Sequence, residues 1–136
     1  MGSLIDTSVL IAAERGELDF DARLEGDPDA GNEEIAISAI SASELLHGIH
    51  RLRAGVRRAR AETLVEGLLS RLPVVPFDLA CARAHAILSA GLRARGQAIG
   101  AHDLLIAATA VAFDYRVVTR DRRSFPKIRD LDVVYW

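Results

Sequence analysis

The sequence predicts an α/β domain with three layers, α/β/α, around a central parallel sheet of four or five short strands. Two observations predict it. Short aliphatic segments alternate along the chain with longer segments of helical periodicity, which is typical of a parallel sheet covered by helices. Residues 104–113 are almost purely apolar and rich in alanine, as in a helix buried against a sheet. The 136 residues, half of them hydrophobic, suffice for one core, so we expect a single domain over residues 1–136.

The first elements are short. We expect a buried strand at residues 4–5, ending at Asp6, and then a helix that Thr7 and Ser8 could cap. The chain then becomes polar, acidic and punctuated by glycine and proline, which predicts a short helix at residues 18–24 followed by a loop.

Two helices are predicted in the middle of the chain, after a second strand at residues 35–38. The first opens near Ser41 and ends near Gly55, because apolar residues recur at helical spacing along one face: Leu45, Ile49, Leu52 and Val56. The second helix is indicated by a further set of apolar residues before Pro73: Leu64, Val65, Leu68, Leu69 and Leu72.

The last third of the chain repeats the strand–helix alternation. A short strand at residues 74–75 leads into a helix over residues 78–95, capped by Asp78. Gly100 stands where the apolar helix to residue 113 would begin. Further strands are expected at residues 116–119 and 133–135.

Charge is unevenly divided, although the net charge is only −2. Residues 1–34 contain ten acidic residues and two arginines, whereas the remainder contains nine acidic and fifteen basic residues. This asymmetry favours a polyanionic or acidic partner, and a solvated charged face is the simpler explanation. The single Cys81 excludes an intramolecular disulfide. With no visible secretory signal and no apolar run long enough to span a bilayer, we expect a soluble, cytoplasmic protein without a membrane anchor.

Four acidic residues stand at equivalent places in the predicted elements. Asp6 ends the first strand, and Asp121 follows the strand at residues 116–119. Glu44 and Asp103 fall in the first turns of two helices. In an open parallel sheet the carboxyl ends of strands and the amino ends of helices share one edge, so these four carboxylates should converge.

Each acid alone has a simpler explanation in helix capping. Ser41 and Glu44, for example, match a capping box, and Asp103 would complement a helix dipole. Capping does not require the helix ends to meet, however, and carboxylates crowded together repel unless one is protonated or a cation joins them. Oxygen-only ligands favour Mg²⁺ or Mn²⁺, and no Cys/His cluster indicates zinc.

The ordered set of motifs resembles the PIN-domain ribonucleases, in particular the VapC toxins of bacterial type II toxin–antitoxin systems. The resemblance covers essentially the whole chain, and it is carried by these segments: Leu4-Ile5-Asp6-Thr7-Ser8-Val9-Leu10, Ser41-x-x-Glu44, Asp103-Leu104-Leu105-Ile106-Ala107-Ala108, and Thr119-Arg120-Asp121 with Phe125 behind it. The long acidic segment from Glu14 to Glu34 departs from the family pattern.

The resemblance implies a Mg²⁺- or Mn²⁺-dependent endoribonuclease that hydrolyses RNA phosphodiesters. Its catalytic, metal-binding acids fall on Asp6, Glu44, Asp103 and Asp121, with Asp6 and Asp103 as the expected direct ligands. Residues that support the site or contact phosphate fall on Thr7, Ser8, Thr119 and Arg120. The implied partners are an RNA substrate and a cognate VapB-like antitoxin, whose tail would lie along a groove. Apolar helices after Ser41 also favour a homodimer.

Other functions stay open at this point. A catalytically silent PIN-like domain could bind RNA or a partner, and a receiver-like phosphoacceptor domain would need a lysine at the site, for which Lys127 is the only candidate. His102 neighbours Asp103, but its side chain is expected to point elsewhere on the helix. An arginine run could bind RNA, pair with Glu62 and Glu66, or face solvent: Arg51, Arg53, Arg57, Arg58 and Arg60. Little aromatic interleaving means that base stacking is not predicted.

Overall fold

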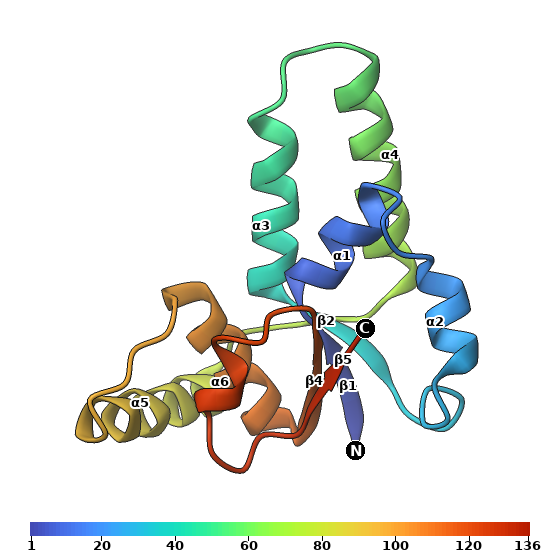
Figure 1. Cartoon of the computed structure of the whole chain (residues 1–136). Helices are drawn as coiled ribbons and strands as arrows, with labels where there is room; N and C mark the ends of the chain where they lie inside the picture. The colour runs from blue at the N-terminus through green and yellow to red at the C-terminus, as the bar shows by residue number, and fades with distance from the viewer.

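A computed structural model describes residues 1–136 and contains one sheet of five parallel strands (Figure 1). The strands are β1 (Gly2–Ile5), β2 (Ile35–Ser38), β3 (Val74–Val75), β4 (Tyr115–Thr119) and β5 (Val133–Tyr135), in the spatial order β3-β2-β1-β4-β5. Every neighbouring pair is parallel, as a strand–helix alternation requires. The predicted fold class is therefore confirmed.

Helices cover both faces of the sheet. They are α1 (Thr7–Glu14), α2 (Phe20–Gly26), α3 (Ala39–His50), α4 (Val56–Arg71), α5 (Leu79–Ala94) and α6 (Ala101–Phe113), with a short 3₁₀ helix at Phe125–Lys127. The helices α1 to α4 pack on one face, and α5 and α6 on the other. Figure 1 shows α3 and α4 as a pair of helices that rises from the sheet like an arm.

Two hydrophobic cores lie on opposite faces of the sheet, because successive side chains of a strand point to opposite sides. Leu4 and Val117 pair across β1 and β4 and pack under α5 and α6. Ile5 and Val118, one position further along, pack under α1, α3 and α4. All four side chains are fully buried, so the strand ends that carry the candidate acids are fixed from both sides.

The helix α3 begins two residues before the start expected near Ser41. The helix begins at Ala39, and its N-cap is Ser38, whose hydroxyl accepts a hydrogen bond from the Ser41 amide at 2.9 Å. The strand β2 therefore passes into the helix with no intervening loop. Ser41 is buried within the first turn, and Glu44 lies in the second turn, so the expected capping box does not form.

The predicted division between α3 and α4 was also wrong. Leu52 and Val56 continue the apolar spacing of α3, yet α3 ends at His50 and α4 already begins at Val56. Gly55 is the N-cap of α4, with φ of 149°, a backbone conformation that glycine adopts readily. Val56 is 70% exposed and does not belong to the core.

Other predicted bounds shift by one or two residues. The short acidic helix is Phe20–Gly26, with Asp19 as its N-cap, and β4 begins at Tyr115. Asp78 caps α5 by accepting the Cys81 amide at 3.0 Å, and Gly100 precedes α6, both as predicted. Cys81 is buried.

Part of the acidic segment has a structural role at the amino end of the sheet. Arg116 on β4 is buried, and its guanidinium lies 2.8 Å from Asp27, 3.3 Å from Asp29 and 3.6 Å from Glu33. The same guanidinium donates to the Ser3 hydroxyl of β1 at 2.5 Å. These contacts fasten the loop after α2 to the two central strands, at the end opposite Asp6.

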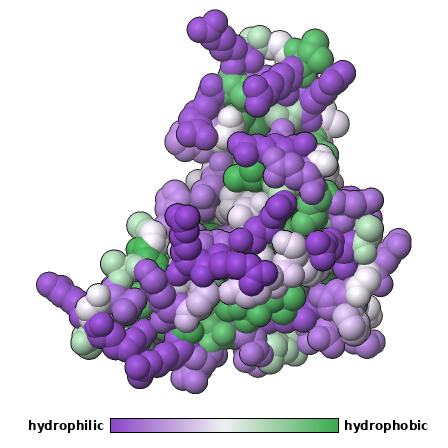
Figure 2. All heavy atoms as spheres, in the orientation of Figure 1, coloured by the Kyte–Doolittle hydropathy of each residue, from purple (hydrophilic) through white to green (hydrophobic).

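No helix of the structure has the length and apolar character needed to cross a bilayer. Hydrophilic side chains cover most of the face in Figure 2, and hydrophobic atoms reach the surface at the tip of the arm and over the base of the molecule. The exposed large hydrophobic side chains include Val56 and Leu64 of α4 and Leu79 and Ile87 of α5.

Candidate functional site

Asp6 lies at the carboxyl end of β1, where it is also the N-cap of α1. It is only 3% exposed. Its Oδ2 atom accepts hydrogen bonds from the Ser8 hydroxyl at 2.6 Å and the Thr119 hydroxyl at 2.8 Å. Two hydroxyl groups, one from the first turn of α1 and one from the end of β4, thus hold one carboxylate in a single orientation.

A chain of hydrogen bonds joins the ends of β1 and β4. The Arg120 amide donates to the Ser8 hydroxyl at 3.0 Å, and the Asp121 amide donates to the Thr119 hydroxyl at 2.9 Å. Because β1 and β4 are neighbours in the sheet, Asp6 and the turn that carries Asp121 are adjacent in space. The structure brings Ser8 and Thr119 to the site, as predicted.

Glu44 reaches the same edge from the second turn of α3. Its Oε1 accepts a hydrogen bond from the Thr7 hydroxyl at 3.1 Å, and its Oε2 lies 3.5 Å from Nδ1 of His102. The expectation that His102 points elsewhere was wrong. This residue lies in the first turn of α6, which begins at the same edge of the sheet as α3, so its ring reaches Glu44.

Asp103 also lies in the first turn of α6, half-buried, and accepts a hydrogen bond from the Ser124 hydroxyl at 2.8 Å. Burial raises the pKa of the Asp103 carboxyl, and the bond from Ser124 acts in the opposite direction. The nearby negative charges of three further acids raise this pKa as well: Asp6, Asp121 and Glu44. The four predicted acids therefore share one electrostatic environment.

Asp121 is held in the ionised form. Burial tends to raise its pKa, but the net pKa is lowered by hydrogen bonds from Arg123 and Ser124 and by the positive charge of Arg123. The Arg123 amide donates to Oδ1 at 2.7 Å. One acid of the group, Asp103, is thus easier to protonate than usual, and another, Asp121, is harder to protonate.

Ser124 is a site residue that the sequence analysis missed. Its hydroxyl bonds Asp103, and it also hydrogen-bonds Asp121, so it links α6 to the turn after β4. The only signal in the sequence is its position three residues after Asp121. That signal is weak, because serine is common in turns.

The donor set fits a hard divalent cation. It consists of carboxylates that repel one another, with oxygen ligands of the kind that Mg²⁺ and Mn²⁺ prefer. No three His, Cys, Asp or Glu side chains stand close enough together to form a ready metal-ligand group. A cation would relieve the repulsion that raises the pKa of Asp103.

Among the basic side chains considered in the sequence analysis, Arg120 lies beside the candidate acids, whereas Arg58 and Lys127 make other contacts. Arg120 is exposed beside the site, with Nη1 3.9 Å from Oε2 of Glu17. The arginine run lies in the turn after α3 and on α4, and its Arg58 pairs with Glu62 at 3.2 Å, one of the predicted alternatives. Lys127 donates to the Ala98 carbonyl at 3.0 Å and does not lie among the acids, which removes the basis of the receiver-like alternative.

Comparisons with known proteins cover nearly the whole chain. The family model described as "PIN domain" matches residues 3–131. The chain is 34% identical over 134 residues to "Ribonuclease VapC" of Rickettsia bellii, covering 98% of this chain and 96% of that protein. It is 31% identical over 102 residues to "tRNA(fMet)-specific endonuclease VapC" of Salmonella typhimurium, covering 75% of each.

Solved structures agree with the sequence comparison. The crystal structure of VapBC2 from Rickettsia felis, bound to a DNA fragment from its promoter, matches with a TM-score of 0.89 and 29% identity. The match covers 100% of this chain and 99% of that chain. The DNA-bound VapBC structure from Salmonella typhimurium gives a TM-score of 0.86 with 26% identity, covering 100% and 98%.

Proposed function

The chain belongs to the PIN-domain family, and on this premise we propose that it is a VapC-type ribonuclease, the toxin of a type II toxin–antitoxin system. The relative from Rickettsia bellii, which matches over nearly its full length, is named a ribonuclease, and the candidate acids lie near one another at the carboxyl edge of the sheet. The reaction is hydrolysis of an RNA phosphodiester, which takes place in the cytoplasm.

The proximity of Asp6, Glu44 and Asp121 to Asp103 carries this proposal: the four side chains share one electrostatic environment, although no three of them stand at metal-ligand spacing. Helix capping requires one acceptor at each helix and gives no reason for the charges of Asp6, Glu44 and Asp121 to raise the pKa of Asp103. A metal-dependent nuclease requires such a concentration of negative charge. Mg²⁺ or Mn²⁺, when bound, lowers the pKa of a coordinated water and stabilises charge on the phosphoryl oxygens.

Each protein group has a defined part in the proposed site. Asp6 and Asp103 hold the cation directly, while Glu44 and Asp121 complete its surroundings. Ser8 and Thr119 fix the orientation of Asp6 through their hydroxyl groups. Thr7 orients Glu44 in the same way. Ser124 aligns Asp103, and Arg120 binds substrate phosphate at the rim.

The test is cleavage of labelled RNAs, initiator tRNA among them, with Mg²⁺ or Mn²⁺ and with EDTA. Asp6→Asn and Asp103→Asn should each reduce cleavage by at least about 100-fold, because loss of a group that holds a metal removes its affinity or alignment. Asp132→Asn is the matched control, since Asp132 is exposed and lies before β5, and it should cleave normally. Metal-independent cleavage, or full activity of both variants, would refute the proposal.

This chain has a groove next to the acids that suits the binding of an antitoxin. A groove of about 380 Å³ lies between α1, α3 and α4, and Glu44 belongs both to its lining and to the site. Its floor is apolar, with Ile11, Leu45 and Ile49, and its rim carries Arg51 and Arg57. We assign this groove to the tail of the antitoxin, whose binding would block access to Glu44.

A homodimer is the proposed assembly. Leu79 and Ile87 on α5 are 66% and 73% exposed, and Val56 and Leu64 on α4 are also exposed, which is unfavourable for a monomer in water. Light scattering with size-exclusion chromatography of the isolated protein would give the mass of two chains. The mass of one chain would contradict this part of the proposal.

A further inference from the structure

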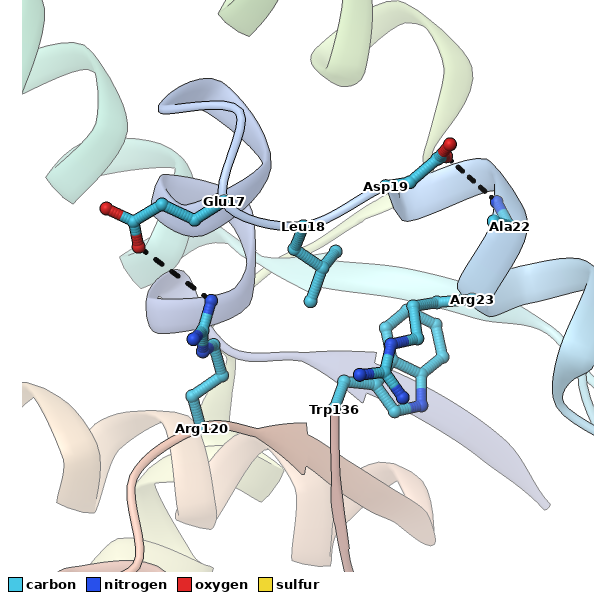
Figure 3. A pocket seen from close by; sticks show the side chains of 7 residues that line it. All are labelled: Glu17, Leu18, Asp19, Ala22, Arg23, Arg120 and Trp136. Carbon is cyan, nitrogen blue, oxygen red and sulfur yellow. Dashed lines mark hydrogen bonds and ion pairs between the residues drawn. The ribbon is translucent and has the colours of Figure 1, made fainter.

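A second hollow opens beside the acids, on the side of α2 (Figure 3). Its volume is about 280 Å³, and seven residues line it: Glu17, Leu18, Asp19, Ala22, Arg23, Arg120 and Trp136. They come from the connection between α1 and α2, from α2 itself, and from the residues that follow β4 and β5. We call it the Trp136 hollow.

The Trp136 hollow is tied to the candidate site through the backbone. The Trp136 amide donates to the Thr119 carbonyl at 3.2 Å, and the Thr119 hydroxyl bonds Asp6. On the other side, the Arg120 amide bonds the hydroxyl of Ser8, which also bonds Asp6. Trp136 and Arg120, on two sides of the hollow, are therefore each linked through two hydrogen bonds to the proposed metal-binding carboxylate.

The lining combines an aromatic wall with guanidinium groups. The Trp136 ring is fixed by an edge contact with Phe20, at 5.7 Å between ring centroids. In Figure 3 the Leu18 side chain points into the space between Arg120 and Trp136. Arg23 is exposed and has no ion pair, and Arg120 has only the long contact of 3.9 Å to Glu17.

These groups match the chemistry of a nucleotide. An aromatic ring and an aliphatic side chain accept the flat face of a base, and base stacking on such rings is the usual way in which proteins hold single-stranded RNA. Guanidinium groups pair with phosphate oxygens, often through two hydrogen bonds. A hollow of this volume has room for one base but not for several.

We propose that the Trp136 hollow binds one nucleotide of a single-stranded RNA next to the scissile phosphate. The base lies against Trp136 and Leu18, and the adjoining phosphate lies between Arg23 and Arg120. The inference rests on the proposed ribonuclease function and extends it, because it makes this hollow a determinant of which nucleotide adjoins the cut. The few aromatic residues of the sequence gave no basis for predicting base stacking, whereas the proposal places one stacked base at Trp136.

In this arrangement Glu17 competes with the substrate phosphate for Arg120. Its carboxylate is the only partner of the Arg120 side chain, at a distance where the attraction is weak and both groups are exposed. Asp19 is already engaged as the N-cap of α2, where it accepts the Ala22 amide at 3.0 Å. Glu17→Gln should therefore free Arg120 and strengthen RNA binding.

The single tryptophan of the chain makes the test specific, because all tryptophan fluorescence comes from Trp136. A short single-stranded RNA with a fluorescein label is added to the whole protein in EDTA, which prevents metal-dependent cleavage. Anisotropy of the label reports binding, and tryptophan emission reports occupation of the hollow. Saturable quenching of Trp136 with the same midpoint as the anisotropy change is expected.

Substitutions at Trp136 and Arg23 separate the contribution of base stacking to RNA affinity from the contribution of positive charge. Trp136→Leu should weaken RNA binding about tenfold, as expected for loss of one stacked base, while Trp136→Phe should retain most of the affinity. Arg23→Ala should also weaken binding. Arg83→Ala is the matched control, because it removes one exposed arginine from α5, away from the hollow, and should bind like the parent protein. Melting temperatures confirm that each variant is folded.

Two outcomes would overturn the inference. One is RNA binding by anisotropy with no change in Trp136 emission. The other is a folded Trp136→Leu protein with unchanged affinity and an unchanged choice of cleavage position. If Asp6→Asn still abolishes metal-dependent cleavage in these cases, the ribonuclease function stands and only the Trp136 hollow is excluded. A protein that neither binds nor cuts RNA would refute both.

Discussion

Asp103 shows most directly what the gathered carboxylates do to one another. Its pKa is raised by burial and by the charges of Asp6, Asp121 and Glu44, although the Ser124 hydroxyl supports the charged form. In the absence of a cation the ionised carboxylate is therefore less favourable in the folded protein than in the unfolded chain. This residue, needed for the proposed chemistry, reduces the stability of the metal-free protein.

Asp103→Asn should consequently stabilise the metal-free protein at neutral pH, by roughly 3 °C in melting temperature. The raised pKa sets the pH dependence: the folded state holds the proton more tightly, so the parent protein loses stability as pH rises through and above the usual carboxyl range. The advantage of Asp103→Asn should be absent at acid pH and grow as the pH rises. Differential scanning fluorimetry in EDTA across this range gives the measurement.

Added Mg²⁺ provides the complementary result. It should raise the melting temperature of the parent protein and have much less effect on Asp103→Asn, because a ligand that binds only the folded state stabilises it. Asp132→Asn serves as the control and should respond to Mg²⁺ like the parent. If Asp103→Asn melted below the parent in EDTA at neutral pH, the inference that the charge on Asp103 destabilises the metal-free protein would be incorrect.

At the residue scale, the sequence predicted the acids better than their neighbours. Asp6, Asp103 and Asp121 could be placed because strand and helix ends determine where their backbones lie. The approach of His102 to Glu44 and the bridge formed by Ser124 depend on side-chain packing between separate elements. Neither follows from local pattern, so neither was predicted.

At the scale of elements, the arm of α3 and α4 was predicted least well. Apolar spacing continued from Leu45 through Leu52 to Val56 and concealed the turn between the two helices. Gly55 was taken as the end of one helix, although it is the N-cap of the next. Periodicity identifies the face of a helix well, but it does not determine the residue at which one helix ends and the next begins.

The groove along this arm leads to a prediction about the antitoxin. Gly48 lines the groove, and a Cβ atom added there meets no other atom within 4 Å, so Gly48→Leu should fold and extend into the groove. It should retain RNA cleavage but weaken inhibition by the cognate antitoxin about tenfold or more, since overfilling a packed contact costs about 1–3 kcal/mol. Titration of antitoxin in the cleavage assay measures the change.

Gly67→Leu is the matched control. Gly67 on α4 also has open space around it and does not line the groove. Both changes replace glycine within a helix and should increase helix stability similarly. Equal inhibition of the two variants by antitoxin would exclude the groove as the binding site for its tail.

At the scale of the whole molecule, the parallel sheet was predicted correctly, but the ion pairs that fasten the acidic segment to its amino end were not. The alternation of strands and helices was sufficient to predict a parallel sheet. The acidic segment gave no sign that Asp27, Asp29 and Glu33 would meet a single arginine on β4, because this contact joins residues far apart in the chain. The unequal charge of the two parts of the sequence therefore has a partly internal explanation.

Asp27→Asn tests this contact. The Arg116 and Asp27 side chains are 9% and 6% exposed, so loss of the Asp27 charge should destabilise the fold by about 3 kcal/mol. Asp29→Asn is the control, because Asp29 is 62% exposed and pairs with the same guanidinium, and it should cost under about 1 kcal/mol. Urea unfolding of both variants compares them, and equal free energies of unfolding would contradict the prediction.

The pH dependence of this contact follows from the lowered pKa of Asp27. Burial acts to raise this pKa, but hydrogen bonds from the Asp29 amide and from Arg116, together with the charge of Arg116, lower it overall. The contribution to stability is therefore complete above the usual carboxyl pKa and is lost as pH falls through the lowered value. Acid should narrow the difference between the parent and Asp27→Asn.

The order of the strands also governs when activity can arise during synthesis. β1 is made before the other strands, yet β4, one of its two neighbours in the sheet, is made only after helices α1 to α6. Until then Asp6 has no Thr119 to hold it, and Asp121 does not yet exist. A growing chain that has not yet reached Asp121 therefore lacks the proposed site, which can form only after β4 has joined the sheet.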